Sequence, residues 1–158
     1  MPAEKNNAGR NWTLTPIFGA ADTAVIDTNI ALDLFVFNDP AAQPLHQALD
    51  AQQLRWLATP AMREELERVL AYPQIVPRLA HYQLTASDVL SRFDSDAQIM
   101  PVAPKAPVTC RDADDQKFID LAVAHQALLL SKDQAVLCMK KRLLPLRVQV
   151  LSSLAAAA

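Results

Sequence analysis

Glycine is scarce in this chain of 158 residues, which contains only two. A loop that cradles a phosphate or a dinucleotide needs several glycines within a few residues, so both of these common functions are excluded. Cysteine is equally scarce, and Cys110 and Cys138 match neither a disulfide framework nor a zinc-binding spacing. The sequence leaves open whether the two form a disulfide, and a reducing cytoplasm is the simpler expectation.

Long hydrophobic runs are also missing. No apolar stretch approaches the roughly 20 residues of a membrane span, and the polar start lacks the apolar middle of a signal peptide. Hydrophobic residues make up 51% and charged residues 20%, which is typical of a globular domain with its own core. We therefore expect a cytoplasmic protein without a membrane segment.

Neither sign of charge dominates, because the net charge is −2. This balance alone neither favours nor excludes a nucleic-acid partner. The densest basic patch lies near the C-terminal end of the chain and comprises Lys140, Lys141, Arg142 and Arg147. Two interpretations of this patch remain open, namely phosphate binding and a solvated helix end with favourable charges.

Short apolar runs alternate with segments that carry helix signals. The predicted strands are 23–26, 54–58, 98–102, 128–130 and 148–151. The predicted helices are 29–37, 41–51, 60–72, 75–82, one from 85, one from 114, and 134–142. This alternation predicts an α/β fold, a three-layer α/β/α sandwich with a mainly parallel sheet of about five strands. We expect a polar arm at 1–22, one domain at 23–151 and a tail at 152–158.

Acidic residues follow two of the predicted strands. Asp27 directly ends the first apolar run, and Asp133 follows the run Leu128–Leu130 after two polar residues. Ligands of open α/β sheets bind beyond the carboxyl ends of the strands, where both side chains are expected. Further acids open or lie on helices, namely Glu64, Glu65, Asp112, Asp114 and Asp115. Because clustered carboxylates repel one another, such a cluster favours a site for a hard cation such as Mg²⁺ or Mn²⁺.

Each of these acids also has a purely structural interpretation. Asp112 and Asp133 are well placed to cap the helices that follow them. Glu64 and Glu65 lie in early turns of a helix, where acidic side chains interact favourably with the helix dipole. Asp27 is the hardest to explain in this way, because an acid at the end of an apolar strand needs a partner.

Four motifs in order resemble those of PIN-domain nucleases. The segment 24–29, Ala-Val-Ile-Asp-Thr-Asn, is similar to the opening strand of that family. Residues 59–70 resemble its second motif, in which Glu65 precedes a leucine on a helix. Residues 112–118 and 129–133 resemble the third and fourth motifs. The resemblance spans about residues 23–151 and is greatest to a bacterial branch of toxins from toxin–antitoxin pairs.

The resemblance implies a metal-dependent ribonuclease. Its acidic ligands of Mg²⁺ or Mn²⁺ would be Asp27, Glu65, Asp115 and Asp133, with Asp112 as a further candidate and Glu64 as the alternative to Glu65. The supporting or substrate-binding residues would be Asn29, Arg111, Lys117, Ser131 and Lys132. The resemblance further implies RNA as substrate, an antitoxin protein as partner, and a homodimer.

Two other functions stay open at this point. The first is a binding module that keeps the fold but acts through protein or RNA partners, with weak metal binding or none. The second is a metal-dependent phosphatase on a similar α/β fold. Asp27 is followed by Thr28 and Asn29, however, and not by the Asp-x-Asp arrangement that haloacid-dehalogenase-like enzymes use for their nucleophile.

Overall fold

The computed structural model describes residues 22–154. The predicted N-terminal arm therefore lies outside the described residues, apart from Asp22. No helix among the described residues is long and apolar enough to cross a membrane. Leu154, which belongs to the predicted tail, is buried and packs in the core.

One parallel sheet forms the centre of the molecule, and the predicted fold class is confirmed. Its strands, in spatial order, are β3 (Ala97–Ile99), β2 (Arg55–Ala58), β1 (Thr23–Ile26), β4 (Leu128–Leu130) and β5 (Val150–Leu151). All four neighbouring pairs are parallel. Every residue of β1 and β4 is buried, as expected for strands that helices cover on both faces.

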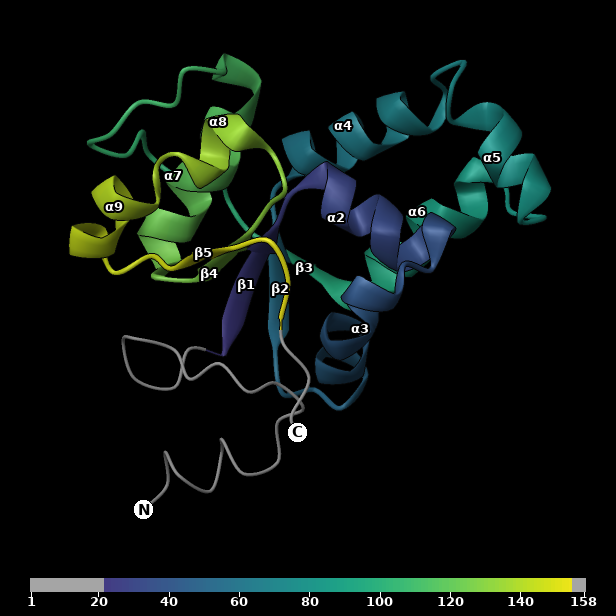
Figure 1. Ribbon diagram of the computed structural model, residues 1–158, viewed down its shortest axis with the longest axis horizontal. Coiled ribbons are helices and arrows are strands. Elements are labelled where there is room, and N and C mark those ends of the chain that lie inside the picture. Colours follow the sequence, from purple (N-terminus) through teal and green to yellow (C-terminus); the bar gives the residue numbers. More distant parts are fainter. Residues whose placement is uncertain (1–21, 155–158) are drawn as a thin grey trace.

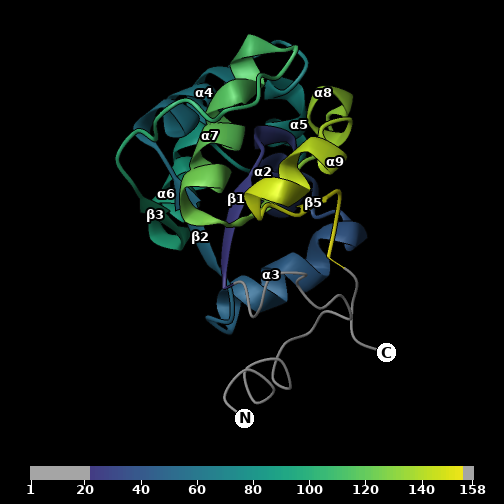
Figure 2. The same cartoon turned by 90° about the vertical axis from the view of Figure 1, so that its left-hand side faces the viewer.

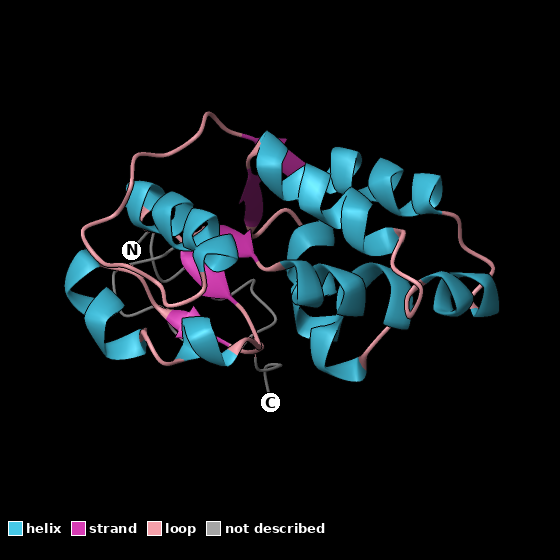
Figure 3. Ribbon diagram, turned by 90° about the horizontal axis from the view of Figure 1, so that it is seen from above, coloured by secondary structure: helices cyan, strands magenta, loops and turns pink. Residues whose placement is uncertain are grey.

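The chain winds from β1 in both directions. The first half places β2 and then β3 on one side of β1, and the second half places β4 and then β5 on the other. Right-handed crossovers consequently put the helices of the two halves on opposite faces of the sheet (Figures 1 and 3). The first group comprises α2 (Thr28–Leu32), α3 (Gln43–Asp50), α4 (Pro60–Leu70), α5 (Val76–His81) and α6 (Ala86–Asp96). The second group comprises α7 (Gln116–His125), α8 (Gln134–Leu137) and α9 (Lys140–Leu143).

Aromatic packing anchors the first group of helices to the sheet. Trp56 on β2 is 1% exposed, as its place in an apolar strand predicts. Its ring stacks on Phe35, with centroids 5.5 Å apart, and meets the edge of Phe93 on α6 at 5.1 Å. Helix α3 lies near the end of the sheet at which β1 begins (Figures 1 and 2). Helices α2, α4, α7 and α8 lie around the opposite end of the sheet, where the strands finish (Figure 1).

Among the predicted elements that differ in extent from the structure, three have a clear physical reason. The strand predicted at 98–102 runs from Ala97 to Ile99, because Pro101 has no backbone N–H for a ladder. The helix predicted at 134–142 divides into α8 and α9, since Met139 leaves helical geometry (φ −94°, ψ 2°) and is fully buried. The helix predicted at 29–37 ends in a π-helical turn, Asp33–Phe37, and Asn38 stops it in the left-handed region.

Both cysteines are free thiols. Cys110 is buried and Cys138 is exposed, yet each thiol donates a hydrogen bond to the carbonyl oxygen of Ala135, at 3.3 and 3.4 Å. The disulfide that the sequence left open is therefore not formed in this structure.

Candidate active site

The carboxyl ends of β1 and β4 place two acidic residues next to each other. The backbone N–H of Asp27 donates to the carbonyl oxygen of Leu130 at 2.9 Å, which extends the pairing of the two strands by one residue. Beyond β4, Ser131 and Lys132 lead to Asp133, which begins α8 and accepts a hydrogen bond from the N–H of Ala135 at 2.9 Å. This is the point at which the strand order reverses, where open α/β sheets bind their ligands.

A third acid arrives from the connection between β3 and α7. Residues 113–115 form a 3-10 turn before α7, and the turn carries Asp115 inward while Asp114 stays exposed. Asp27, Asp115 and Asp133 each offer one carboxylate oxygen, and these oxygens all lie within 4.8 Å of one another. We call these three residues the Asp triad. Asp27 is 4% and Asp115 7% exposed, so the triad is largely shielded from water.

Ser131 links two members of the Asp triad. Its hydroxyl donates to Oδ2 of Asp27 at 2.6 Å and accepts from the backbone N–H of Asp133 at 3.0 Å. The side chain is 0% exposed, so both hydrogen bonds of its hydroxyl are made in the protein interior. Ser131 therefore fixes the orientation of Asp27 relative to the loop that carries Asp133.

The electrostatics of the Asp triad are unfavourable without a cation. Burial, the hydrogen bond with Asp133, and the negative charges of Asp27 and Asp133 raise the pKa of Asp115 to about 8. Burial also raises the pKa of Asp27, although the hydrogen bond from Ser131 opposes the rise. Both shifts have the sign expected when like charges are crowded in a poorly solvated site.

The residues present fit a divalent cation. Oδ2 of Asp115 is a buried oxygen that has no hydrogen-bond partner within the described part of the chain. Among residues 22–154, the ion pairs of the nearby lysines go to other carboxylates, so the Asp triad has no basic partner. Three converging carboxylates with an unused oxygen are a hard donor set of the kind that Mg²⁺ and Mn²⁺ prefer.

Glu65 on α4 lies beside the Asp triad but does not belong to it. Its Oε2 accepts a hydrogen bond from Oγ1 of Thr28, and its Oε1 accepts one from Nζ of Lys117 at 2.6 Å. Because Thr28 directly follows Asp27, its hydrogen bond brings Glu65 next to Asp27, and the negative charge of Glu65 contributes to the raised pKa of Asp27. Glu64, the alternative that the sequence left open, is exposed.

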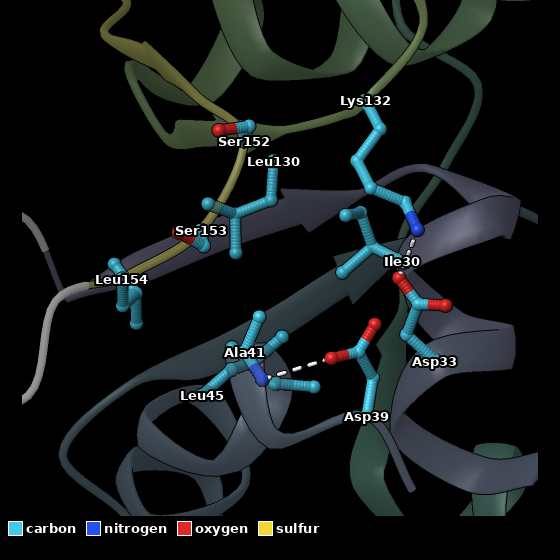
Figure 4. A pocket seen from close by; sticks show the side chains of 11 residues that line it. Ile30, Asp33, Asp39, Ala41, Leu45, Leu130, Lys132, Ser152, Ser153 and Leu154 are labelled. Atoms are coloured by element: carbon cyan, nitrogen blue, oxygen red, sulfur yellow. Dashed lines mark hydrogen bonds and ion pairs between the residues drawn. The ribbon is translucent and has the colours of Figure 1, made fainter. Parts of the chain in front are cut away.

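The remaining predicted residues are exposed, unlike Asp27 and Asp115. Asp112 is exposed and accepts a hydrogen bond from the N–H of Asp114 at 3.0 Å, which is its capping role. Asn29 lies exposed in the first turn of α2, and Arg111 is exposed in the loop before the 3-10 turn. Lys132 forms an ion pair with Asp33 (Figure 4).

Sequence reasoning missed two residues of this region. Asp33 is 7% exposed and holds Lys132 at the rim of a small pocket (Figure 4). Thr28 belongs to the motif at 24–29, but that motif does not indicate its hydrogen bond to Glu65. A signal for Asp33 was available, because it is a single acidic residue within the otherwise apolar run 30–37.

Fold and site together define a class: parallel α/β proteins with a carboxylate site suited to a divalent cation. A family profile described as PIN domain matches residues 23–135, a range that contains the whole Asp triad. The chain therefore belongs to the PIN domain family. PIN domains are generally nucleases and typically use divalent metal ions. Comparison with curated proteins gives no match.

Proposed function

We propose that this protein is a metal-dependent ribonuclease that hydrolyses phosphodiester bonds of RNA, with Mg²⁺ or Mn²⁺ held by the Asp triad. The observation that carries the proposal is the buried Oδ2 of Asp115, which has no partner among three converging carboxylates. An unpaired buried acceptor destabilises the fold. A divalent cation bound to this oxygen would offset that cost.

A divalent ion in this site would lower the pKa of a water molecule and offset the negative charge of the scissile phosphate. The chain's own residues prepare the site for that ion. Asp115 would hold a bound cation as a carboxylate, because the positive charge would offset the repulsion that raises the pKa of Asp115. Ser131 holds Asp27 in place, so that the carboxylates need not reorganise when the ion binds.

RNA is negatively charged and is repelled by the acidic site, so basic side chains near the site are needed to bind its phosphates. Lys117 is partly exposed beside the Asp triad, and Arg111 is exposed four residues before Asp115, the buried member of the 3-10 turn. We assign both to phosphate contacts, together with Asn29 at the start of α2. The exposed basic residues of α9, Lys140 and Lys141, extend this role along the strand of RNA.

The test is cleavage of labelled single-stranded RNA by purified full-length protein, with Mn²⁺ or Mg²⁺ against EDTA. The catalytic control is Asp27→Asn, and the matched control is Asp22→Asn, which neutralises an exposed aspartate just before β1. We expect metal-dependent cleavage that Asp27→Asn abolishes and Asp22→Asn retains. Equal activity of all three proteins would indicate a contaminating nuclease and would contradict the proposal.

Whether water is the nucleophile can be tested on the same RNA. Attack by the 2′-hydroxyl of RNA leaves a cyclic phosphate, whereas attack by water does not require that hydroxyl. We therefore expect cleavage to survive a single 2′-deoxy substitution at the scissile nucleotide. Loss of cleavage at that position alone would argue against hydrolysis by water.

We further propose that the protein acts in the cytoplasm as the toxin of a toxin–antitoxin pair, is neutralised by an antitoxin protein and works as a homodimer. This proposal rests on the resemblance of its motifs to that branch of the family. Expression in a bacterial host should arrest growth for the wild type but not for Asp27→Asn. Normal growth with folded wild-type protein would favour the alternative, a PIN-fold binding module that acts through protein or RNA partners.

A further inference from the structure

Glu65 is an acid of the site whose charge is already balanced. Both of its oxygens are occupied, one by the hydroxyl of Thr28 and the other by the ammonium group of Lys117. The ion pair is partly buried, because the side chain of Glu65 is 17% exposed and that of Lys117 is 25% exposed. A pair with this degree of shielding is screened much less than one on the surface.

Lys117 is held in place from three directions. It lies in the first turn of α7, two residues after Asp115. Its Nζ donates to Glu65 on α4 and to the backbone carbonyl oxygen of Asp114. The ammonium group also lies 4.9 Å from the centre of the Phe118 ring. The positive charge is therefore fixed at the same end of the sheet as the Asp triad.

An ammonium group and a divalent cation compete for the same carboxylate oxygen. Glu65 accepts a hydrogen bond from Thr28, the residue that follows Asp27, so without Lys117 the carboxylates of Glu65 and Asp27 would form a second acidic position beside the Asp triad. Two cations about 3.5–4 Å apart are a common arrangement for phosphodiester hydrolysis, and each one needs carboxylate ligands. In this structure the oxygen of Glu65 that such an ion would need is bound to Lys117.

We propose that Lys117 takes the place of a second divalent cation, so that the site binds a single ion at the Asp triad while the Lys117 ammonium supplies the second positive charge. This inference rests on the proposed function, because it assumes that the Asp triad binds a cation. It makes Glu65 a partner of Lys117, and not a ligand of the ion held by Asp27, Asp115 and Asp133.

The experiment counts bound Mn²⁺ by electron paramagnetic resonance, since free Mn²⁺ gives a signal that diminishes on binding. Full-length protein is titrated, and circular dichroism checks that each variant is folded. We expect one Mn²⁺ per chain for the wild type and for Lys117→Arg, which keeps the charge. We expect two for Lys117→Gln, because Glu65 is then free to bind an ion. Lys117→Met, which keeps the aliphatic stem, repeats the test if glutamine disturbs the fold.

Two further variants identify the cause of any change. The double variant Lys117→Gln with Glu65→Gln should return to one Mn²⁺, because the added ligand has been removed. Arg68→Gln removes a positive charge that is exposed one turn further along α4, and it should leave the count at one. A count of two for Arg68→Gln would mean that net charge, and not the Lys117 contact, sets the number of ions.

The possible outcomes separate this inference from the proposed function. Two Mn²⁺ ions in the wild type, or one in Lys117→Gln, would overturn the inference and leave the ribonuclease proposal intact. No Mn²⁺ in the wild type would overturn the metal site itself and the inference with it. The expected pattern of one, two and one for the wild type, the single variant and the double variant supports both.

Discussion

Asp115→Asn should make the metal-free protein more stable while it removes a metal ligand. The pKa of Asp115 is raised from 3.8 to about 8, so at pH 7 the folded protein keeps a proton that the unfolded chain has lost. Each pH unit between two pKa values corresponds to about 1.4 kcal/mol, so ionisation of the unfolded chain disfavours folding by up to about 4 kcal/mol at pH 7. Asparagine is neutral in both states and avoids this penalty.

The pH dependence has a definite sign. Because the folded pKa is raised, the contribution of Asp115 to stability is fully present below pH 3.8 and is lost as the pH rises to about 8. Wild type and Asp115→Asn should therefore differ little near pH 4. The difference should grow in favour of the variant up to about pH 8 and then stay constant.

Urea unfolding followed by circular dichroism measures this difference in EDTA between pH 4 and pH 9. The matched control is Asp114→Asn, because Asp114 is the exposed neighbour of Asp115 and should follow the wild type. Addition of Mn²⁺ at pH 8 should stabilise the wild type and Asp114→Asn but not Asp115→Asn. If Asp115→Asn were less stable than the wild type at pH 8 in EDTA, the ionised form of Asp115 could not be the source of a destabilisation in the folded protein.

Three other perturbations follow from the contacts described above. Ser131→Ala removes the hydrogen bond to the buried carboxylate of Asp27, so we expect a further rise in the pKa of Asp27 and a loss of about 1–3 kcal/mol in unfolding experiments. The same variant should bind Mn²⁺ at least about tenfold more weakly in calorimetry, whereas unchanged binding would mean that Ser131 does not position Asp27. Trp56→Ala should lower the unfolding free energy by about 3–5 kcal/mol, because it leaves a cavity between two aromatic rings; a loss below about 1 kcal/mol would contradict this packing. A thiol reagent should modify the exposed Cys138 quickly and the buried Cys110 only in denaturant, and equal rates in the folded protein would contradict the burial of Cys110.

Much of the sheet could be predicted from the sequence because buried parallel strands are short and apolar. The runs at 23–26 and 128–130 coincide with β1 and β4. The placement of Asp27 and Asp133 follows from the same observation, since the carboxyl ends of parallel strands meet at one edge. The ends of helices and strands that depend on tertiary packing were harder to predict from the sequence, as the division of the last predicted helix at Met139 illustrates.

The roles of the acidic residues near helix starts were harder to predict from the sequence. Asp112, Asp114 and Asp115 lie within four residues, and only the 3-10 turn decides that Asp115 is buried while the other two are exposed. The partner of Glu65 was not predictable either, because Lys117 is 52 residues away in the sequence. Local patterns indicated which acids were candidates, and contacts between distant segments decided their roles.

We propose above that Asp27, Asp115 and Asp133 together hold a divalent cation. A calorimetric titration of Mn²⁺ into full-length protein tests this most directly, with Asp27→Asn as the site variant and Asp22→Asn as the exposed control. We expect saturable binding to the wild type and to Asp22→Asn, and binding at least about tenfold weaker to Asp27→Asn, since a ligand is lost. Equal binding by all three proteins, or none by the wild type, would show that the Asp triad does not hold the ion.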